Sequence, residues 1–174
     1  MKWVKKNEEV FYPKQTDIIE VAKQDIDYLI QEAQKNIRKR ARYCTHSSAE
    51  DDVHEMIIYH KKGTYIRPHK HIGKTESFHL IDGETDVVFF DDEGKIEHVL
   101  SLGVYASGKP FYYRIPESVY HSQIFRKNTL FHEVTKGPFE KDETVFPRWA
   151  PEEDKHSLVN EYMKKLNLQV QALL

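Results

Sequence analysis

The chain has a single cysteine, Cys44, among its 174 residues. One cysteine excludes a disulfide within the chain and a zinc site built from several cysteines, and it suits a reducing compartment. The sequence also lacks a run of 18 apolar residues, and its first residues, MKWVKKNEEVFYPK, contain no apolar segment of the kind that a signal peptide needs. We therefore expect a cytoplasmic protein with no membrane partner.

Net charge is also nearly absent, because 26 Lys and Arg residues face 28 Asp and Glu residues, which gives a formal charge of -2. Such a balance creates no field that would attract nucleic acid or an anionic membrane, so we expect a small-molecule ligand and no nucleic-acid partner. Hydrophobic residues make up 39% and aromatic residues 12% of the chain, which excludes a disordered protein. Histidine, by contrast, is abundant, with ten residues.

The middle of the chain, residues 53–136, has the pattern of consecutive strands. Short segments rich in Val, Ile, Phe, Tyr and Thr follow one another, separated by turn formers such as Asp82-Gly83 and Pro116. About eight strands at this spacing, with no helix between them, predict an antiparallel sandwich or barrel. The predicted strands are VHEMIIYH, TYIRP, ESFHLI, TDVVFF, KIEHVLSL, FYYRI, HSQIF and TLFHEV.

The two ends of the chain have a different pattern. Apolar residues at helical spacing follow Asp25, a candidate N-cap, and predict a helix over residues 25–40, and a second apolar stripe predicts a helix over residues 152–167. Before the first helix, Val10–Tyr12 and Ile18–Val21 resemble edge strands. Because proteins usually cover exposed sheet edges, we expect these segments to pair with a second copy of the chain in a homodimer.

A cluster of histidines lies between two glycines, in the order Gly63, five residues, His69, one residue, His71, four residues, Glu76, six residues, Gly83. On a strand, residues two apart project from the same face, so His69 and His71 would present two imidazoles together. Glu76 follows a loop short enough to return its carboxylate towards them. The pattern therefore predicts three side chains of a metal site.

A fourth ligand is expected from a neighbouring strand, and His121 is the candidate. Three imidazoles and one carboxylate leave open coordination positions and suit one divalent transition metal, whether Fe, Mn, Ni, Co, Cu or Zn. With no cysteine in the set, a tetrahedral structural zinc is not favoured. The alternative is that these histidines line a barrel and are satisfied by hydrogen bonds alone.

The histidine pattern resembles the first motif of the cupin superfamily, G-x5-H-x-H-x4-E-x6-G, and matches it completely. The second cupin motif, G-x5-P-x-G-x2-H-x3-N, is kept in part: Pro116 and His121 are in place, whereas Ser118 replaces the inner Gly, Phe125 the Asn and Pro110 the first Gly. These departures concern the turn and substrate contacts more than the metal-binding His.

The resemblance implies a mainly β fold of the cupin type, a double-stranded β-helix or jelly-roll barrel with an N-terminal and a C-terminal helix. We expect one cupin domain over residues 1–174, with a barrel core at residues 53–136.

A narrower resemblance, to the WbuC family of cupin-fold metalloproteins, covers residues 38–153. It is carried by the stretches RPHKH, ESFHLIDG, VVFFDDEGKI, IPESVYHS, EVTKGPF and FPRWAPEE. This resemblance implies a metalloprotein associated with surface-polysaccharide gene clusters, but no particular reaction. Arg42 and His46 share it and are our candidates for substrate-binding residues.

These observations favour a metal-dependent enzyme that acts on a small polar metabolite, such as a carbohydrate or nucleotide-sugar derivative, by isomerisation, epimerisation or an oxygen-dependent reaction. The alternative is a non-catalytic cupin module in which the metal orients a sugar or stabilises the barrel. The basic run from Lys35 to Arg42 also has two interpretations, a solvated helix end or an anion clamp for a sugar phosphate.

Overall fold

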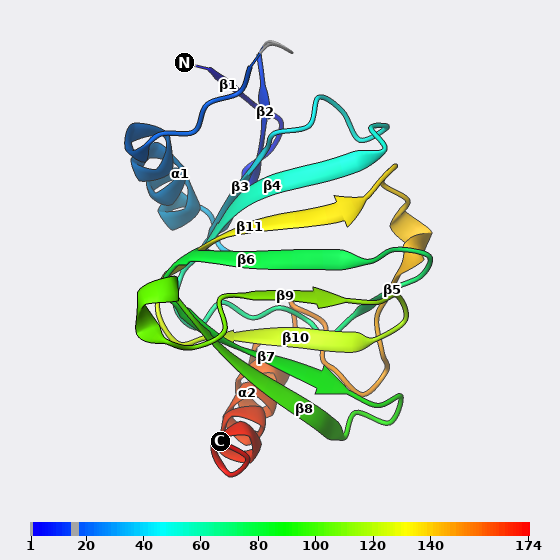
Figure 1. The fold of residues 1–174 in the computed structure, drawn as a ribbon. Helices are drawn as coiled ribbons and strands as arrows, with labels where there is room; N and C mark the ends of the chain where they lie inside the picture. Colours follow the sequence, from blue (N-terminus) through cyan, green and yellow to red (C-terminus); the bar gives the residue numbers. More distant parts are fainter. Residues whose placement is uncertain (1, 15–17) are drawn as a thin grey trace.

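The computed structural model describes residues 2–14 and 18–174, and its strands form three sheets (Figure 1). The large sheet has the order β1-β2-β3-β4-β11-β6-β9, and the small sheet has the order β10-β7-β8. The strands of the large sheet are β1 (Trp3–Lys5), β2 (Val10–Pro13), β3 (Arg40–Cys44), β4 (Val53–His60), β11 (Thr129–Lys136), β6 (Glu76–Asp82) and β9 (Tyr112–Ile115). Those of the small sheet are β10 (Tyr120–Phe125), β7 (Glu84–Phe90) and β8 (Ile96–Gly103).

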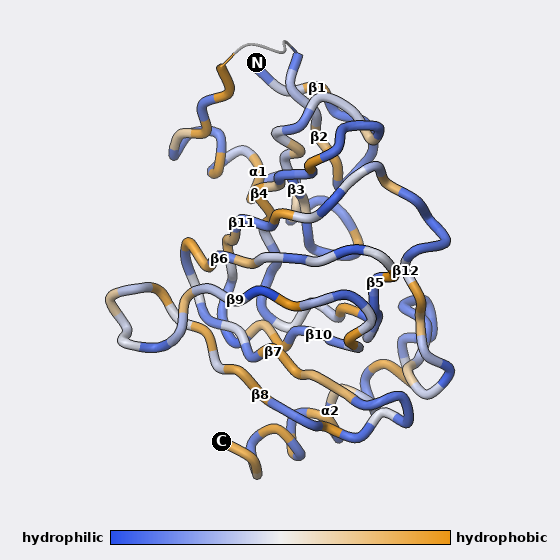
Figure 2. Tube along the Cα trace, turned by 45° about the vertical axis from the view of Figure 1, so that its right-hand side comes forward, coloured by the Kyte–Doolittle hydropathy of each residue, from blue (hydrophilic) through white to orange (hydrophobic). Residues whose placement is uncertain are grey.

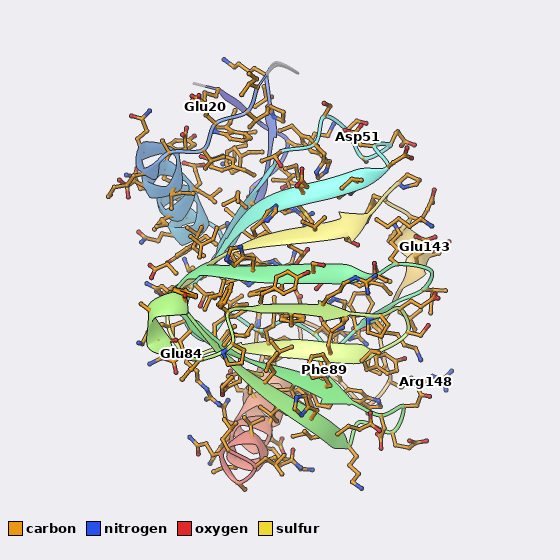
Figure 3. All side chains as sticks on the ribbon, viewed as in Figure 1. Glu20, Asp51, Glu84, Phe89, Glu143 and Arg148 are labelled. Atoms are coloured by element: carbon orange, nitrogen blue, oxygen red, sulfur yellow. The ribbon has the colours of Figure 1, made fainter. Side chains whose placement is uncertain are left out.

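A third sheet pairs two short strands, β5 (Lys70–His71) and β12 (Thr144–Val145). Two helices, α1 (Lys23–Lys35) and α2 (His156–Gln171), and two short 3-10 helices, Tyr105–Ser107 and Lys141–Glu143, complete the fold. Glu143 and Arg148 lie at the end of the strands where β5 is found, whereas Glu84 lies at the opposite end (Figures 1 and 3). The segment that follows β11 therefore returns across one end of the barrel.

The core lies between the large and the small sheet. Phe78 and Leu80 of β6 and Phe131 of β11 meet Val87 of β7 and Leu102 of β8, and each of these side chains is at most 2% exposed. Phe78 stacks on Phe131 with ring centroids 4.2 Å apart. Figure 2 shows a hydrophobic stretch in β7, a strand in which five of seven residues are buried.

Each helix covers the outer face of one sheet (Figure 1). Leu29 and Ala33 of α1 pack against Tyr43 of β3, and all three side chains are fully buried. At the other side, Leu166 and Val170 of α2 pack against residues of β7 and β10. Among the described residues, no helix is long and apolar enough to cross a membrane.

Seven of the eight strands predicted in the middle of the chain are present, from β4 to β11. The exception is TYIRP, because residues 64–68 form no strand. They run beside β10, where the Ser122 hydroxyl donates to the carbonyl of Ile66 over 2.6 Å and the Gly63 N–H donates to the carbonyl of Phe125 over 3.2 Å.

Both helices differ in extent from the prediction. The first spans Lys23–Lys35 rather than residues 25–40, since the Asn36 side chain turns the chain by donating to the carbonyl of Arg40 over 2.6 Å and Arg40 begins β3. Asp25 is not the N-cap: it lies in the first turn and accepts a hydrogen bond from the Ala22 N–H at 2.9 Å. The second helix spans His156–Gln171 rather than residues 152–167.

The N-terminal strands pair within the chain. Val10–Pro13 is a strand as predicted, but it lies parallel to β3 of the same chain, with Val10 opposite Arg42. Ile18–Val21 forms no strand. Val10–Tyr12 therefore pairs within its own chain, β1 is an edge strand of the large sheet, and the homodimer stays a prediction.

Candidate metal centre

A pair of backbone hydrogen bonds brings His69 and His121 together. The His69 N–H donates to the carbonyl of His121 at 3.1 Å, and the His121 N–H donates back to the carbonyl of His69 at 2.9 Å. Residues that exchange both hydrogen bonds across an antiparallel pair lie directly opposite each other. Their imidazole centroids are 4.5 Å apart, although the two residues are far apart in the sequence.

The same local contact orients both rings. In His69 the Nδ1 atom lies 2.9 Å from the carbonyl oxygen of Arg67, and in His121 the Nδ1 atom lies 3.0 Å from the carbonyl oxygen of Val119. A carbonyl only accepts, so Nδ1 must carry the proton in each ring. This tautomer leaves Nε2 with a free lone pair, the form in which imidazole binds a metal.

His71 and Glu76 complete the group. The Nε2 atom of His71 lies 3.4 Å from one carboxylate oxygen of Glu76, and the Nε2 atom of His121 lies 3.7 Å from the other. The Nδ1 atom of His71 faces the hydroxyl of Thr144 on β12 at 3.3 Å. Ring nitrogens of the three histidines all lie within 4.8 Å of one another.

Strand alternation explains why Glu76 points at the imidazoles. Glu76, Phe78 and Leu80 are 5%, 0% and 2% exposed, whereas His79 between them is exposed. Side chains on a strand alternate between its two faces, so the three buried side chains point inward. The sequence predicted this direction for Glu76 and the outward direction for His79, and both predictions are confirmed.

The turn before His121 is the place where the second cupin motif is incomplete. Ser118, which replaces a Gly, has a φ of 64°, in the left-handed region that glycine adopts most easily. Its N–H donates to the carbonyl of His71 at 2.7 Å, and the Glu117 carboxylate accepts from the Gly73 N–H at 2.7 Å. These contacts fasten the turn to the loop after His71, so the turn keeps its conformation without glycine.

Burial sets the charges of the group. It lowers the pKa of His69 to about 3 and also lowers the pKa of His121, so both rings are neutral at neutral pH. Burial by itself would raise the pKa of Glu76, but the hydrogen bond with His71 and the nearby His121 and His69 rings outweigh it and lower the pKa. Neutral imidazoles beside an ionised carboxylate are a donor set that fits a divalent transition metal.

The group opens on a cavity of about 400 Å³. Besides the three histidines and Glu76, its walls include Ile58, Ile66, Gln123, Phe131 and Phe146 from the barrel and the segment across its end. It also contains Glu133 of β11, whose pKa is raised well above its ordinary value by burial and by the charge of Glu76. A cavity of this size suits a small metabolite.

The two predicted substrate-binding residues are separated. Arg42 of β3 lines the cavity, whereas His46 does not. The ring of His46 stacks on that of His54 at a centroid distance of 4.1 Å, and its Nδ1 atom lies 3.0 Å from the carbonyl oxygen of Glu55. The structure therefore places Arg42, but not His46, in the wall of the cavity beside the histidines, and a substrate-binding role for either residue stays a prediction.

Glu133 and Arg67 are two charged residues of the cavity whose place there was not predicted from the sequence. Glu133 lies two residues after the buried Phe131 on β11, so alternation alone places it inward, and this signal was available. Arg67 precedes His69 by two residues in a segment taken for a strand, and only the fold shows that it lines the cavity.

Comparisons with known proteins concern the fold of the chain. Residues 21–102 match a family described as a domain of unknown function (DUF6016). A crystal structure of a protein from Shewanella oneidensis matches with a TM-score of 0.52 and 11% identity, over 69% of this chain and 82% of that one. No curated protein matches the sequence.

Salicylate 1,2-dioxygenase from Pseudoaminobacter salicylatoxidans, solved as a mutant in complex with gentisate, matches with a TM-score of 0.56 and 12% identity. The match covers 74% of this chain and 37% of the dioxygenase, so the chain spans little more than a third of that protein. At such low identity the likeness concerns the fold alone. The mainly β architecture, its two facing sheets and these neighbours together identify the fold of the chain as a cupin fold.

Proposed function

We propose that the chain is a cupin-fold metalloenzyme that holds one divalent transition metal on His69, His71, Glu76 and His121. The observation that carries the proposal is the convergence of three imidazoles within 4.8 Å at the wall of a cavity of about 400 Å³. Glu76 contributes the carboxylate, since its two oxygens face His71 and His121. A group that served only to stabilise the barrel would need no adjacent cavity.

A bound ion would supply Lewis-acid or oxygen-activating chemistry at its open coordination positions. The chain's own residues supply the rest of the site. Arg67 and Val119 hold the His69 and His121 rings through backbone carbonyls, and Phe146 lies in the cavity wall with its ring 6.1 Å from that of His69. Glu133, whose pKa is raised by burial and by the charge of Glu76, is a candidate for holding or delivering a proton inside the cavity.

The substrate that we propose is a small polar metabolite such as a carbohydrate or nucleotide-sugar derivative. The support for it is the resemblance to the WbuC family, which connects the chain with surface-polysaccharide metabolism. Isomerisation, epimerisation and an oxygen-dependent reaction are the candidate reactions. The ligand types do not select the native metal, because affinity order alone does not choose among these ions.

The test is elemental analysis of the protein purified without chelators or a metal-affinity tag. We expect about one equivalent of a divalent transition metal per chain in the parent. A His69→Ala, His71→Ala double variant should contain none, and circular dichroism checks that it is folded. Full metal occupancy in the folded double variant would contradict the proposed ligand set.

Activity measurements distinguish an enzyme from the non-catalytic alternative. An enzyme should convert a metabolite only when metal is bound, whereas a binding or structural module should show metal-dependent binding or stability without turnover. Activity with a redox-inactive metal in the absence of oxygen would favour isomerisation or epimerisation, and oxygen consumption would favour an oxygen-dependent reaction.

A further inference from the structure

Four arginines line the cavity, and two of them are neutralised by carboxylates. Arg38 lies 3.1 Å from Glu9 and 2.5 Å from Glu153, and Arg40 lies 3.0 Å and 3.5 Å from the same two residues. Two guanidinium groups and two carboxylates thus alternate in a closed network. This part of the wall has no net charge to offer a ligand.

The other two arginines, Arg42 and Arg67, have no carboxylate within 4.0 Å in the described part of the chain. Arg67 donates from Nη2 to the carbonyl of Pro147 at 3.2 Å and lies over the ring of Phe146, 5.0 Å from its centroid. Its Nε atom is buried and has no hydrogen-bond partner in the structure. A buried donor without a partner is costly unless a ligand or water satisfies it.

Arg42 reaches the same cavity from β3 of the large sheet. On β3 it pairs with Ile58 of β4, which also lines the cavity, and with Val10 of β2. Neighbouring residues in register project from the same face of a sheet, so Arg42 points to the cavity side. Arg67, by contrast, belongs to the chain segment that leads to His69.

The charge balance of the cavity is positive. Outside the Arg38 and Arg40 network, the carboxylates in its wall are Glu76, assigned to the metal centre, and Glu133. Even with Glu133 ionised, Arg42 and Arg67 exceed it by one charge, and a divalent ion outweighs the single charge of Glu76. The exposed Lys141 adds a further cation.

We propose that Arg42 and Arg67 form an oxyanion subsite beside the metal centre, so that the substrate carries a carboxylate or phosphate group. The inference rests on the proposed function, because it assigns the substrate class of the same cavity. Guanidinium forks match carboxylate and phosphate oxygens with two parallel hydrogen bonds. The subsite would hold the anionic group while the rest of the metabolite reaches the metal centre.

Isothermal titration of the nickel-loaded full chain with malonate and with inorganic phosphate tests the subsite. We expect the parent to bind at least one of these anions, and to bind malonamide, the uncharged analogue of malonate, about 10-fold or more weakly. Arg42→Gln and Arg67→Gln should each weaken anion binding by about 10-fold or more, the size expected for a charge-assisted hydrogen bond. If Arg42→Gln and Arg67→Gln weaken the binding of malonate, the subsite takes a carboxylate. If they weaken the binding of inorganic phosphate, it takes a phosphate.

Arg114→Gln is the matched control, because Arg114 is exposed on β9 and does not line the cavity. It should bind the anions as the parent does. Arg67→Lys keeps the charge without the fork and should weaken binding as well, which covers the case in which Arg67→Gln does not fold. Anion affinities within twofold of the parent in folded Arg42→Gln and Arg67→Gln, or no anion binding by the parent, would overturn the subsite.

Nickel content, measured on the same samples, separates the two proposals. A parent that binds no nickel but binds malonate through Arg42 and Arg67 would contradict the metal centre and support the subsite. A parent that binds nickel but neither anion would support the metal centre and overturn the subsite.

Discussion

The interior of the barrel has two halves that are built from shared strands but differ in chemistry. In the packed half, apolar side chains fill the space between the two sheets; in the cavity half, imidazoles, carboxylates and guanidinium groups line an open volume. β6 contributes to both halves, because Glu76 faces the histidines while Phe78 and Leu80 are packed in the core. Alternation therefore determines which side chains point inward, and position along the strand determines what they meet.

The largest effect should come from opening a hole in the packed half. Phe78 is fully buried and stacks on Tyr113 and Phe131 at 5.2 Å and 4.2 Å. Phe78→Ala should lower the free energy of unfolding by about 3–5 kcal/mol, measured by denaturant titration of the metal-free protein. The folded fraction should still bind metal with the parent's stoichiometry. If metal is lost from the folded variant, the two halves are not independent.

The next effect concerns Glu76, the polar residue of β6. Glu76→Gln keeps the shape of the side chain but removes the anionic ligand. We expect metal affinity to fall at least as far as it does when an outer-shell partner is lost, about 10- to 100-fold. Competition with a chelator of known affinity measures the change. Glu133→Gln, in the same cavity, serves as the control and should leave metal affinity close to that of the parent.

A smaller effect follows from His60 in the cavity half. Burial, followed by the charges of Arg42 and Arg38, lowers its pKa from 6.5 to about 3. Between these pH values the unfolded chain takes up a proton that the folded chain does not, so stability is full above pH 6.5 and declines as the pH falls. His60→Phe should reduce this decline by up to about 1.4 kcal/mol per pH unit.

The measurement for His60 is a series of denaturant titrations of the metal-free protein between pH 6.5 and pH 4, in the parent and in the variant. Equal slopes of unfolding free energy against pH in the two proteins would show that His60 titrates normally when folded.

The smallest effect is expected at Ser118. A left-handed conformation costs a residue other than glycine roughly 1–2 kcal/mol, partly offset by the greater freedom of glycine in the unfolded chain. Ser118→Gly should therefore raise the free energy of unfolding by up to about 1 kcal/mol, with metal affinity unchanged. A thermal unfolding series measures it, and a lower stability in the variant would mean that the Ser118 conformation is not strained.

The sequence predicted the parts of the fold that depend on local pattern. β4 and the strands from β6 to β11 could be recognised because β-branched and aromatic residues alternate between turn formers. The inward direction of Glu76 followed from the same alternation. The end of α1 was missed because Ile37 continues the helical spacing of apolar residues, although its side chain is 79% exposed and lies beyond the helix.

The parts that were missed depend on long-range contacts. Arg67 is the first residue of the stretch RPHKH, but its place in the cavity depends on the segment before His69 running beside β10. The pairing of β12 with β5, which sets Thr144 against His71, joins residues that are far apart in the sequence. Likewise, the sequence alone does not show that Arg38 and Arg40, but not Arg42, form ion pairs with Glu9 and Glu153.

His69 and His121 each contact the carbonyl of the residue two positions earlier. This contact affects the conformational entropy that is lost when a metal ion binds. Because backbone carbonyls two residues earlier orient His69 and His121, their side chains lose rotational freedom when the protein folds rather than when the metal arrives. The ion therefore meets a preorganised pair of nitrogens and causes little rearrangement. The heat-capacity change on metal binding should accordingly be small, since little surface is buried in that step.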